Sequence, residues 1–210
     1  MVSVTEETMH SFFAYLARMR QIRRWGLMRN TFDENVQEHS LQVAHIAHCL
    51  AIIRNRRYSG GADPARAVEL AVYHDTAEVI TGDLPTPIKY FSASLTSAYG
   101  QIEQLARNRL LAMLPEDLRG AYEAFIIEPE QDGEWQRVKA ADRICAYLKC
   151  VEEERSGNSE FTQAKHAIAK TIDAIDLPEV KDFMHEFVPA FLLSLDELNG
   201  SSETDAQLDH

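Results

Sequence analysis

The chain has 210 residues, of which 45% are hydrophobic and 26% are charged, and it carries a formal net charge of -12. This balance is typical of a soluble globular protein that is long enough to bury one core. An acidic surface repels phosphate backbones, so we expect no nucleic-acid partner. A small anionic substrate would need a local basic group or a metal ion to overcome that field.

Cysteine usage and the first residues favour a cytoplasmic protein. Cys49, Cys145 and Cys150 form an odd set without a C-x-x-C spacing, which indicates buried, reduced thiols rather than a disulfide framework or a zinc ribbon. Glu6 and Glu7 stand where a signal peptide would carry basic residues, and no apolar run approaches the roughly 18 residues of a membrane span. We therefore expect no membrane partner.

Helical periodicity runs along the whole chain, and alternating strand patterns are nearly absent. Apolar residues at helical spacing predict helices over 5–23 and 36–57. Asp63 followed by Pro64 is a typical helix start and predicts a helix that runs to about residue 79. The prolines and the glycine within 81–87 then force a loop.

The second half of the chain is predicted to be helical as well. We expect a helix over about 94–113, another that opens at Pro115, a polar linker over 128–133, and a long helix over about 134–155 that is capped by Gly157. Two or three more helices reach Asn199. The expected fold class is therefore an all-α helical bundle in a single domain over 1–199, with a polar, disordered tail over 200–210.

A histidine, an aspartate and a glutamate interrupt one apolar helix. His74 and Asp75 are adjacent, and on a continuous helix Glu78 follows one turn later on the same face. Imidazole with carboxylate is a good ligand set for a transition metal, and Glu78 is placed to act on a water molecule there. A helix end with His74 hydrogen-bonded to a neighbouring acid explains this segment equally well.

A further histidine, His39, stands near the start of the helix predicted over 36–57. His45 and His48 lie on the same helix but face about 240° and 180° away from it, so they cannot share its site. They are better explained as ordinary surface or core histidines.

A distant aspartate, Asp142, completes the candidates. It follows Ala140 and Ala141, which leave room for close helix approach. Taken alone, an ion pair with Arg143 or Lys139 is the better explanation of this residue.

Together, a histidine, a His-Asp pair with a glutamate three residues on, and a distant aspartate resemble the HD superfamily of metal-dependent phosphohydrolases. Longer strings resemble, more specifically, the bacterial 5'-deoxynucleotidases of the YfbR type, and the resemblance covers about residues 12 to 198. Gly26 departs from that pattern, which has proline there, and it loosens the backbone without touching a ligand. The strings are Arg24-Trp25, Glu34-Asn35-Val36, Glu38-His39-Ser40, Tyr73-His74-Asp75 with Glu78, Thr81-Gly82-Asp83-Leu84-Pro85-Thr86-Pro87, and Lys139-Ala140-Ala141-Asp142.

The resemblance implies an HD-domain bundle, a homodimer, and one divalent metal ion per chain, such as Co or Mn. It implies that Glu78 and Arg24 are catalytic, with Glu78 assisting the attacking water. The implied metal ligands are His39, His74, Asp75 and Asp142. The implied substrate contacts are Arg24, Trp25, His39, Asp75, Asp83, Leu84, Pro85, Thr86 and Asp142.

The side chains implied to hold the nucleotide suit that role chemically. Arg24 lies in a basic stretch with no acid among residues 8–32, and a guanidinium offers two parallel hydrogen bonds to phosphate. Trp25 can pack on a sugar or base, although it can equally be core filler. Asp83 can accept a hydrogen bond from a sugar hydroxyl, or it can cap the bend at Gly82.

We therefore expect a 5'-deoxynucleotidase, a phosphoric monoester hydrolase that converts 2'-deoxyribonucleoside 5'-monophosphates to deoxynucleosides and inorganic phosphate. Two alternatives stay open. One is an HD phosphohydrolase for another phosphoester, such as a cyclic dinucleotide or a nucleoside triphosphate. The other is a non-catalytic metal-binding or oligomerisation module. The sequence sets neither the physiological metal nor the base preference.

Overall fold

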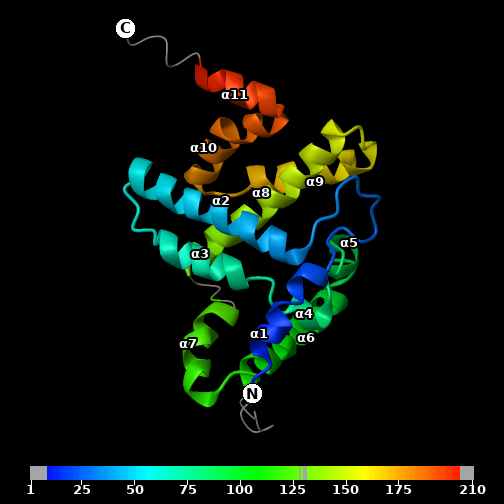
Figure 1. Ribbon diagram of the computed structural model, residues 1–210, viewed down its shortest axis with the longest axis vertical. Helices are drawn as coiled ribbons and strands as arrows, with labels where there is room; N and C mark the ends of the chain where they lie inside the picture. The colour runs from blue at the N-terminus through cyan, green and yellow to red at the C-terminus, as the bar shows by residue number, and fades with distance from the viewer. Residues whose placement is uncertain (1–8, 128, 130–131, 204–210) are drawn as a thin grey trace, which may run out of the picture.

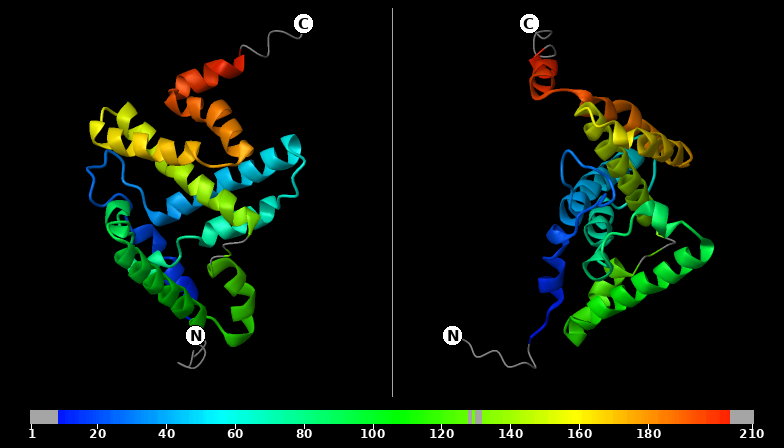
Figure 2. Two further views of the ribbon diagram at one scale, coloured as in Figure 1. Left: turned by 180° about the vertical axis from the view of Figure 1, so that it is seen from behind. Right: turned by 90° about the vertical axis from the view of Figure 1, so that its right-hand side faces the viewer.

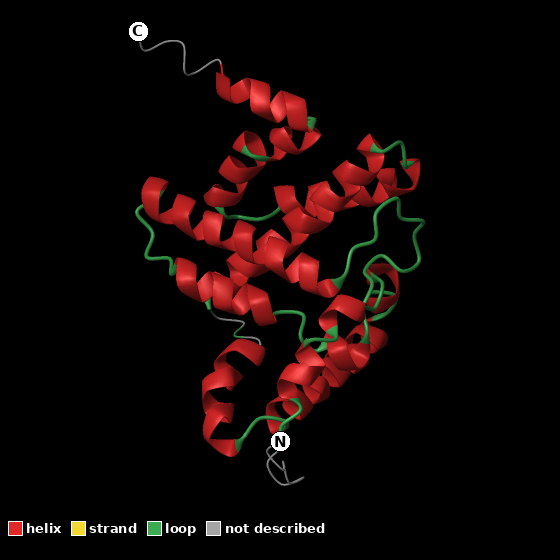
Figure 3. Cartoon of the chain, viewed as in Figure 1, coloured by secondary structure: helices red, strands yellow, loops and turns green. Residues whose placement is uncertain are grey.

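A computed structural model of the chain describes residues 9–127, 129 and 132–203. Helices make up the regular structure of this part, as Figure 3 shows, and within it no strand forms beyond an isolated bridge between Arg23 and Asn35. The predicted all-α class is therefore confirmed. The helices, most of them labelled in Figure 1, are α1 (Phe12–Leu16), η2 (Met19–Gln21), α2 (Val36–Arg57), α3 (Pro64–Tyr73), α4 (Glu78–Thr81), α5 (Thr86–Lys89), α6 (Ala93–Ala112), α7 (Glu116–Ile126), α8 (Gly133–Arg155), η3 (Ser159–Phe161), α9 (Thr162–Asp173), α10 (Pro178–Glu186), η4 (Val188–Leu192) and α11 (Leu195–Glu203).

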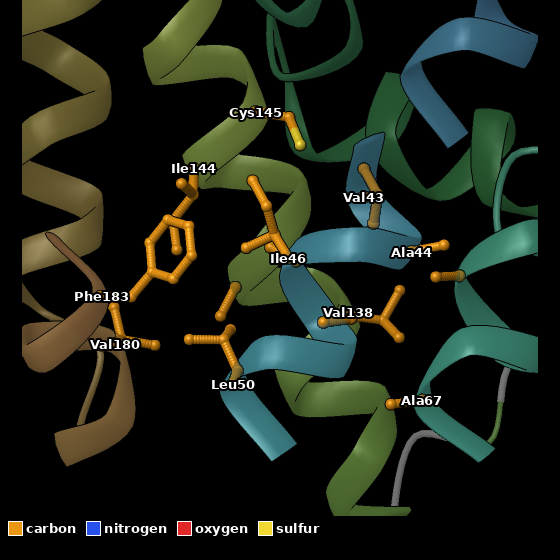
Figure 4. Packing of buried hydrophobic residues seen from close by; sticks show 14 of the residues in the cluster. Val43, Ala44, Ile46, Leu50, Ala67, Val138, Ile144, Cys145, Val180 and Phe183 are labelled. Carbon is orange, nitrogen blue, oxygen red and sulfur yellow. The ribbon is translucent and has the colours of Figure 1, made fainter. Parts of the chain in front are cut away.

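The centre of the molecule is formed by α2, α3 and α8, which pack on one another, with α10 against α2 (Figures 1 and 2). Their contact faces carry buried alanines, among them Ala47, Ala67 and Ala141. Such small side chains let the helices approach closely, and larger residues fill the spaces that remain. Figure 4 shows this packing for Val43, Ala44, Ile46, Leu50, Ala67, Val138, Ile144, Cys145, Val180 and Phe183.

A second apolar cluster lies where α1, α6 and α7 meet. Its buried members are Phe12, Leu110, Leu114 and Ile126. Val79 and Ile80 of α4 pack against it, so this cluster supports the short helix that begins with Glu78. In the described part of the chain, no helix is both long and apolar enough to cross a membrane.

Side-chain caps fix where two of the central helices begin. Asn35 Oδ1 accepts the backbone N–H groups of Gln37 and Glu38 at 3.1 and 3.0 Å, which starts α2 at the predicted residue. Asp63 Oδ1 does the same for the first turn of α3, where Pro64 fits because its missing N–H would have no partner there. Both predicted starts are confirmed.

The helix predicted over 5–23 is wrong in extent. Residues 5–8 lie outside the described part, and α1 ends at Leu16 and gives way to the single turn η2. The chain then leaves the helical path because Ile22 and Arg24 pair with a later segment: Val36 N–H donates to Ile22 O at 3.0 Å, and Arg24 N–H donates to Glu34 O at 2.9 Å. Long-range pairing of this kind overrides a local helical pattern.

The helix predicted to run from Asp63 to about residue 79 is also interrupted. It ends at Tyr73, and a tight turn leads into α4 at Glu78. The Thr76 hydroxyl donates to Tyr73 O at 2.8 Å, and Glu78 N–H bonds Asp75 O at 3.0 Å, three residues back. Such bonds tighten the backbone and end an α-helix, so the premise of one continuous helical face was wrong.

The remaining boundaries agree closely with the expected ones, apart from the C-terminal end. Helix α6 covers the range expected from the pattern, α7 opens after Pro115, and Gly157 has the positive φ of 85° typical of a residue after a helix. Helix α11 runs past Asn199 to Glu203, into the segment expected to be a disordered tail. Part of the predicted linker over 128–133, and residues 204–210, lie outside the described residues.

Candidate functional site

Three central elements each bring polar side chains to one buried point. The first turn of α2 carries His39, the turn after α3 carries His74 and Asp75, and the middle of α8 carries Asp142. His39 Nε2 lies 3.0 Å from Asp142 Oδ1, and His74 Nε2 lies 3.1 Å from Asp75 Oδ2. One ligand atom each from His39, His74 and Asp142 lie within 4.8 Å of one another. The structure thus brings together the four residues predicted to bind a metal.

Both histidine rings are oriented by groups outside this cluster. His74 Nδ1 lies 2.7 Å from Ala71 O, and since a carbonyl only accepts, Nδ1 carries the proton and leaves the Nε2 lone pair facing the cluster. His39 Nδ1 lies 3.4 Å from Glu34 Oε1 on the far side of its ring. Among the described residues, His39 Nδ1 and the buried Nε2 atoms of both rings have no hydrogen-bond partner, so His39 faces Glu34 without a formed hydrogen bond.

These donors fit a divalent transition metal. Two neutral imidazole nitrogens and two carboxylates are a suitable set for such an ion, and they leave coordination positions for other ligands. A buried polar atom without a partner costs free energy, and a cation facing both Nε2 atoms would remove that cost. The same arrangement does not support the simple explanation in which Asp142 pairs with Lys139, because Lys139 Nζ instead lies over the Trp135 ring, 4.7 Å from its centroid.

Negative charge is concentrated around this point. Glu78 is partly buried beside it, and burial, followed by the charges of Asp75 and Asp83, raises the pKa of Glu78 to about 10. Burial also raises the pKa of the Asp142 carboxyl, but the close contact with His39 and the charge of that ring outweigh it and hold the pKa below its ordinary value. The negative charges of the carboxyl groups repel one another, so those nearest to a positive partner stay ionised and Glu78 holds its proton more tightly.

Arg24 supplies one permanent positive charge to this group. Its side chain is 13% exposed, with Nη1 3.5 Å from Asp75 Oδ2 and Nε 3.6 Å from Glu34 Oε2. Burial lowers the pKa of Arg24, but the surrounding carboxylates, with Asp75 contributing most, raise it above its ordinary value. The residue predicted to bind phosphate thus lies beside a predicted metal ligand, although it is fifty-one positions away along the chain.

Trp25 lies next to Arg24 in an unusual conformation. Its φ is 58°, in the left-handed region that side chains other than glycine rarely adopt. Its carbonyl accepts the Met28 N–H at 2.9 Å and the Asn30 side chain at 3.2 Å, and its ring packs on Phe161. These contacts hold the turn, and the indole Nε1 donates to Glu34 Oε2 at 2.9 Å.

A buried ion pair on α8 holds the segment that follows Trp25. The Glu153 carboxylate is fully buried and accepts the backbone N–H groups of Thr31 at 2.8 Å and Phe32 at 3.2 Å. Lys149 donates both to this carboxylate and to Phe32 O. The chain between Trp25 and Glu34 is therefore fixed to α8 through paired, fully satisfied charges.

The loop predicted to contact the nucleotide begins after α4. Gly82 has a φ of 73°, and its carbonyl accepts the Tyr99 hydroxyl at 3.3 Å. Burial is the main reason why the pKa of Asp83 is raised, and the charge of Arg24 and the Trp25 backbone N–H act in the opposite direction. This loop therefore lies beside the turn that carries Arg24 and Trp25. Leu84 and Pro85 are half-buried, whereas Thr86 is exposed at the start of α5.

Other candidates lie away from the cluster. His45 and His48 are exposed on the outer face of α2, in agreement with the explanation preferred for them. Conversely, no motif in the sequence singles out Lys149 or Glu153, and Glu34 appears there only within one of the strings that carry the family resemblance. One local signal points to Glu34: it directly precedes Asn35, which caps α2 one turn before His39.

The comparisons with known proteins decide the family. A family model described as 5'-deoxynucleotidase YfbR-like matches residues 11–191. The chain belongs to this family. A 5'-deoxynucleotidase of Erwinia tasmaniensis is 51% identical over 192 residues, which cover 91% of this chain and 97% of the relative. One of Vibrio cholerae is 51% identical over 189 residues, with 90% and 97% covered.

Solved structures show the same fold. An HD-domain phosphohydrolase from Listeria innocua (lin2634) superposes with a TM-score of 0.78 at 21% identity, covering 93% of this chain and 98% of its own. The HD phosphohydrolase DatZ of cyanophage S-2L, solved with dA and one catalytic Zn²⁺ ion, superposes with a TM-score of 0.58 at 20% identity, covering 90% and 98%. The HD-domain helical bundle expected for this YfbR-like chain is thus confirmed.

The donor cluster generates a prediction about stability. Adding Mn²⁺ or Co²⁺ to chelator-treated protein is expected to raise Tm, because an ion that binds only the folded state stabilises it by about 2.7 kcal/mol when its free concentration is 100 times Kd. In Asp142→Ala the shift in Tm is expected to be lost. Differential scanning calorimetry over a metal series measures both, with the exposed Asp173→Ala as the matched control. A wild-type shift in Asp142→Ala would remove this residue from the ligand set.

Proposed function

We propose that this protein is a metal-dependent 5'-nucleotidase that hydrolyses 2'-deoxyribonucleoside 5'-monophosphates to a deoxynucleoside and inorganic phosphate. The observation that carries the proposal is the convergence of His39, His74, Asp75 and Asp142 on one point, with Glu78 and Arg24 beside it. Relatives named 5'-deoxynucleotidase, about half identical along nine tenths of the chain, support the choice of substrate.

His39, His74, Asp75 and Asp142 would hold one divalent ion, for which Co or Mn are the expected metals. When bound, the cation supplies Lewis-acid stabilisation of negative charge, makes water more acidic, and lowers the pKa of neighbouring carboxyl groups such as Glu78. The protein itself contributes a buried site with both imidazoles already oriented by Ala71 O and Glu34. Preorganised ligands of this kind need no rearrangement before the reaction.

Glu78 is the group that we expect to orient the attacking water and take its proton. It begins α4, directly after the turn with His74 and Asp75, and its Oε2 is buried with no hydrogen-bond partner in the described residues. A carboxylate in that position can accept a proton from water as it attacks phosphorus in line with the departing 5'-oxygen. The proton would then go to the departing 5'-oxygen, which leaves as the hydroxyl of the deoxynucleoside.

Arg24 is the group that we expect to bind the phosphate. Its guanidinium is fixed against Asp75 and offers planar donors that match phosphate oxygens and the negative charge that develops on them. Trp25 and the loop over 83–86 would pack on the sugar near its 2' position, where ribose carries a hydroxyl that deoxyribose lacks. The proposal includes a homodimer, which the family resemblance implies, and a cytoplasmic location, which the cysteine usage favours.

Glu78 is expected to act on the chemistry and leave metal binding intact. Glu78→Gln preserves the shape of the side chain but cannot accept the proton, so kcat for dAMP should fall by about 100-fold or more, the usual scale for a general base. Metal content by elemental analysis should equal that of wild type. Glu69→Gln, an exposed glutamate on α3, is the control with unchanged kcat. Loss of metal from Glu78→Gln, or an unchanged kcat, contradicts the role.

Substrate choice is expected to depend on Arg24. Wild type should prefer dAMP to 3'-dAMP and dATP, because the reversed sugar leaves Arg24 without a partner and a triphosphate brings more charge to acidic walls. AMP should be rejected by about 100-fold only, the scale at which an apolar pocket discriminates against an added hydroxyl. Arg24→Ala should lower kcat/KM for dAMP by about 100-fold or more.

Arg24→Lys should recover only part of that loss, because an ammonium group cannot reproduce the two parallel hydrogen bonds of arginine. Steady-state kcat/KM for all four nucleotides, in wild type and both variants at saturating metal, measures these effects. An Arg24→Ala enzyme that hydrolyses dAMP as well as wild type would show that Arg24 does not bind the phosphate. A wild type that prefers dATP would contradict the proposed substrate.

A further inference from the structure

The Glu34 carboxylate contacts both halves of the site described above. Its Oε2 accepts a hydrogen bond from Trp25 Nε1 at 2.9 Å and lies 3.6 Å from Arg24 Nε. Its Oε1 lies 3.4 Å from His39 Nδ1, on the side of the ring opposite to Asp142. One carboxylate therefore joins the two side chains expected to hold the nucleotide to a histidine expected to hold the metal.

We propose that Glu34 is a positioning residue that couples metal binding at His39 to the placement of Arg24 and Trp25. The inference rests on the proposed function for the identity of the ligands, but its geometry does not depend on the substrate. Glu34 itself needs to touch neither metal nor nucleotide. It acts through the ring of His39 and through the two side chains that it holds.

Backbone hydrogen bonds on both sides of Glu34 hold its side chain in place between Arg24 and His39. Arg24 N–H donates to Glu34 O at 2.9 Å, so the residues at the two ends of the intervening loop are paired directly. Asn35, the next residue, caps α2, and His39 N–H donates to Asn35 O at 3.0 Å. The Glu34 side chain, 13% exposed, thus stands at a fixed distance from both Arg24 and His39.

The two histidines of the cluster differ in their outer partner. His74 uses a backbone carbonyl, Ala71 O, whereas the group outside His39 is a carboxylate. A carboxylate on the outer nitrogen of a metal-binding histidine fixes the tautomer and makes the ring a stronger ligand, and removing such a partner typically costs 10- to 100-fold in metal affinity or activity. Only the His39 partner also holds Trp25.

A neutral amide cannot replace this carboxylate. The Trp25 indole N–H donates to Glu34 Oε2, and Glu34 Oε1 faces His39 Nδ1 at 3.4 Å, so this geometry suits a side chain with two accepting oxygens. Glutamine has one accepting oxygen and one NH₂ group, which is a donor, so Glu34→Gln can satisfy Trp25 or His39 but not both. The substitution therefore breaks the coupling while it preserves the size of the side chain.

The test is metal affinity of the full-length protein, measured without substrate by competition with a chelator. Glu34→Gln is expected to bind Mn²⁺ 10- to 100-fold more weakly than wild type. Glu34→Asp keeps the charge but is one methylene shorter, so its affinity should fall between the two. Glu38→Gln, an exposed glutamate in the first turn of α2, should bind like wild type, and so should Trp25→Phe, which leaves the contact with His39 in place.

The kinetic part of the test uses saturating Mn²⁺. There both Glu34→Gln and Trp25→Phe should raise KM for dAMP. Trp25→Phe loses the hydrogen bond from the indole to Glu34, and Glu34→Gln loses the negative charge beside Arg24 Nε, so Arg24 and Trp25 are held less firmly. Wild-type Mn²⁺ affinity in both Glu34→Gln and Glu34→Asp would overturn the inference. A wild type that binds Mn²⁺ tightly and fails to hydrolyse dAMP would instead overturn the proposed function, and the affinity ratio of the variants would still decide the role of Glu34.

Discussion

Two histidines and two aspartates meet where α2, α3 and α8 pack together. The burial of the two histidines, with the partly exposed aspartates against them, is the constraint to which the surrounding structure is fitted. Charged groups taken out of water are costly unless they are paired and hydrogen-bonded. Here the aspartates face imidazole rings, Arg24 adds a fixed positive charge, and the outer nitrogen of His74 has a carbonyl partner. The remaining inward-facing nitrogens form, with Asp142, a donor set that suits a divalent cation.

Helix α8 organises both halves of this site. Lys149 and Glu153 follow Asp142 by seven and eleven positions, which is close to two and three full helical turns. The three side chains therefore share one face of the helix. The first faces the histidines, and the other two hold the segment over 31–32. One rigid helix therefore sets the distance between the candidate metal centre and the loop that carries Trp25.

The contacts around Trp25 explain how this residue can keep a strained backbone conformation. A tryptophan at positive φ is costly, and such a conformation persists where the surrounding contacts determine it completely. The hydrogen bonds to the Trp25 carbonyl, the packing on Phe161 and the bond to Glu34 meet this condition. These contacts hold the turn although Gly26 stands where the family pattern has proline.

Much of the bundle could be predicted because helix periodicity and caps are local signals. The apolar spacing that begins at Val36, and the start signals at Asp63 and Pro115, mark helix starts that the structure reproduces. The breaks after Leu16 and Tyr73 could not be predicted in this way. The first depends on pairing with residues 34–36 and the second on a threonine hydroxyl that bonds back to Tyr73. Neither signal is contained in the periodicity of the segment itself.

The candidate site shows the same division. His39, His74, Asp75 and Asp142 could be selected because their order along the chain follows a known pattern, and the structure brings them together. The roles of Glu34, Lys149 and Glu153 depend on contacts across ten to more than a hundred residues, with no motif to mark them. Spatial neighbours of this kind become visible only in the folded chain.

We propose that one cation and one phosphate meet between the histidine cluster and Arg24. A crystal structure of the Glu78→Gln variant with Co²⁺ and dAMP tests it most directly, through the anomalous scattering of cobalt. We expect a single anomalous peak about 2.0–2.1 Å from the Nε2 atoms of His39 and His74. It also predicts that the dAMP phosphate lies between that peak and the Arg24 guanidinium. A peak elsewhere, or a phosphate remote from Arg24, would contradict it.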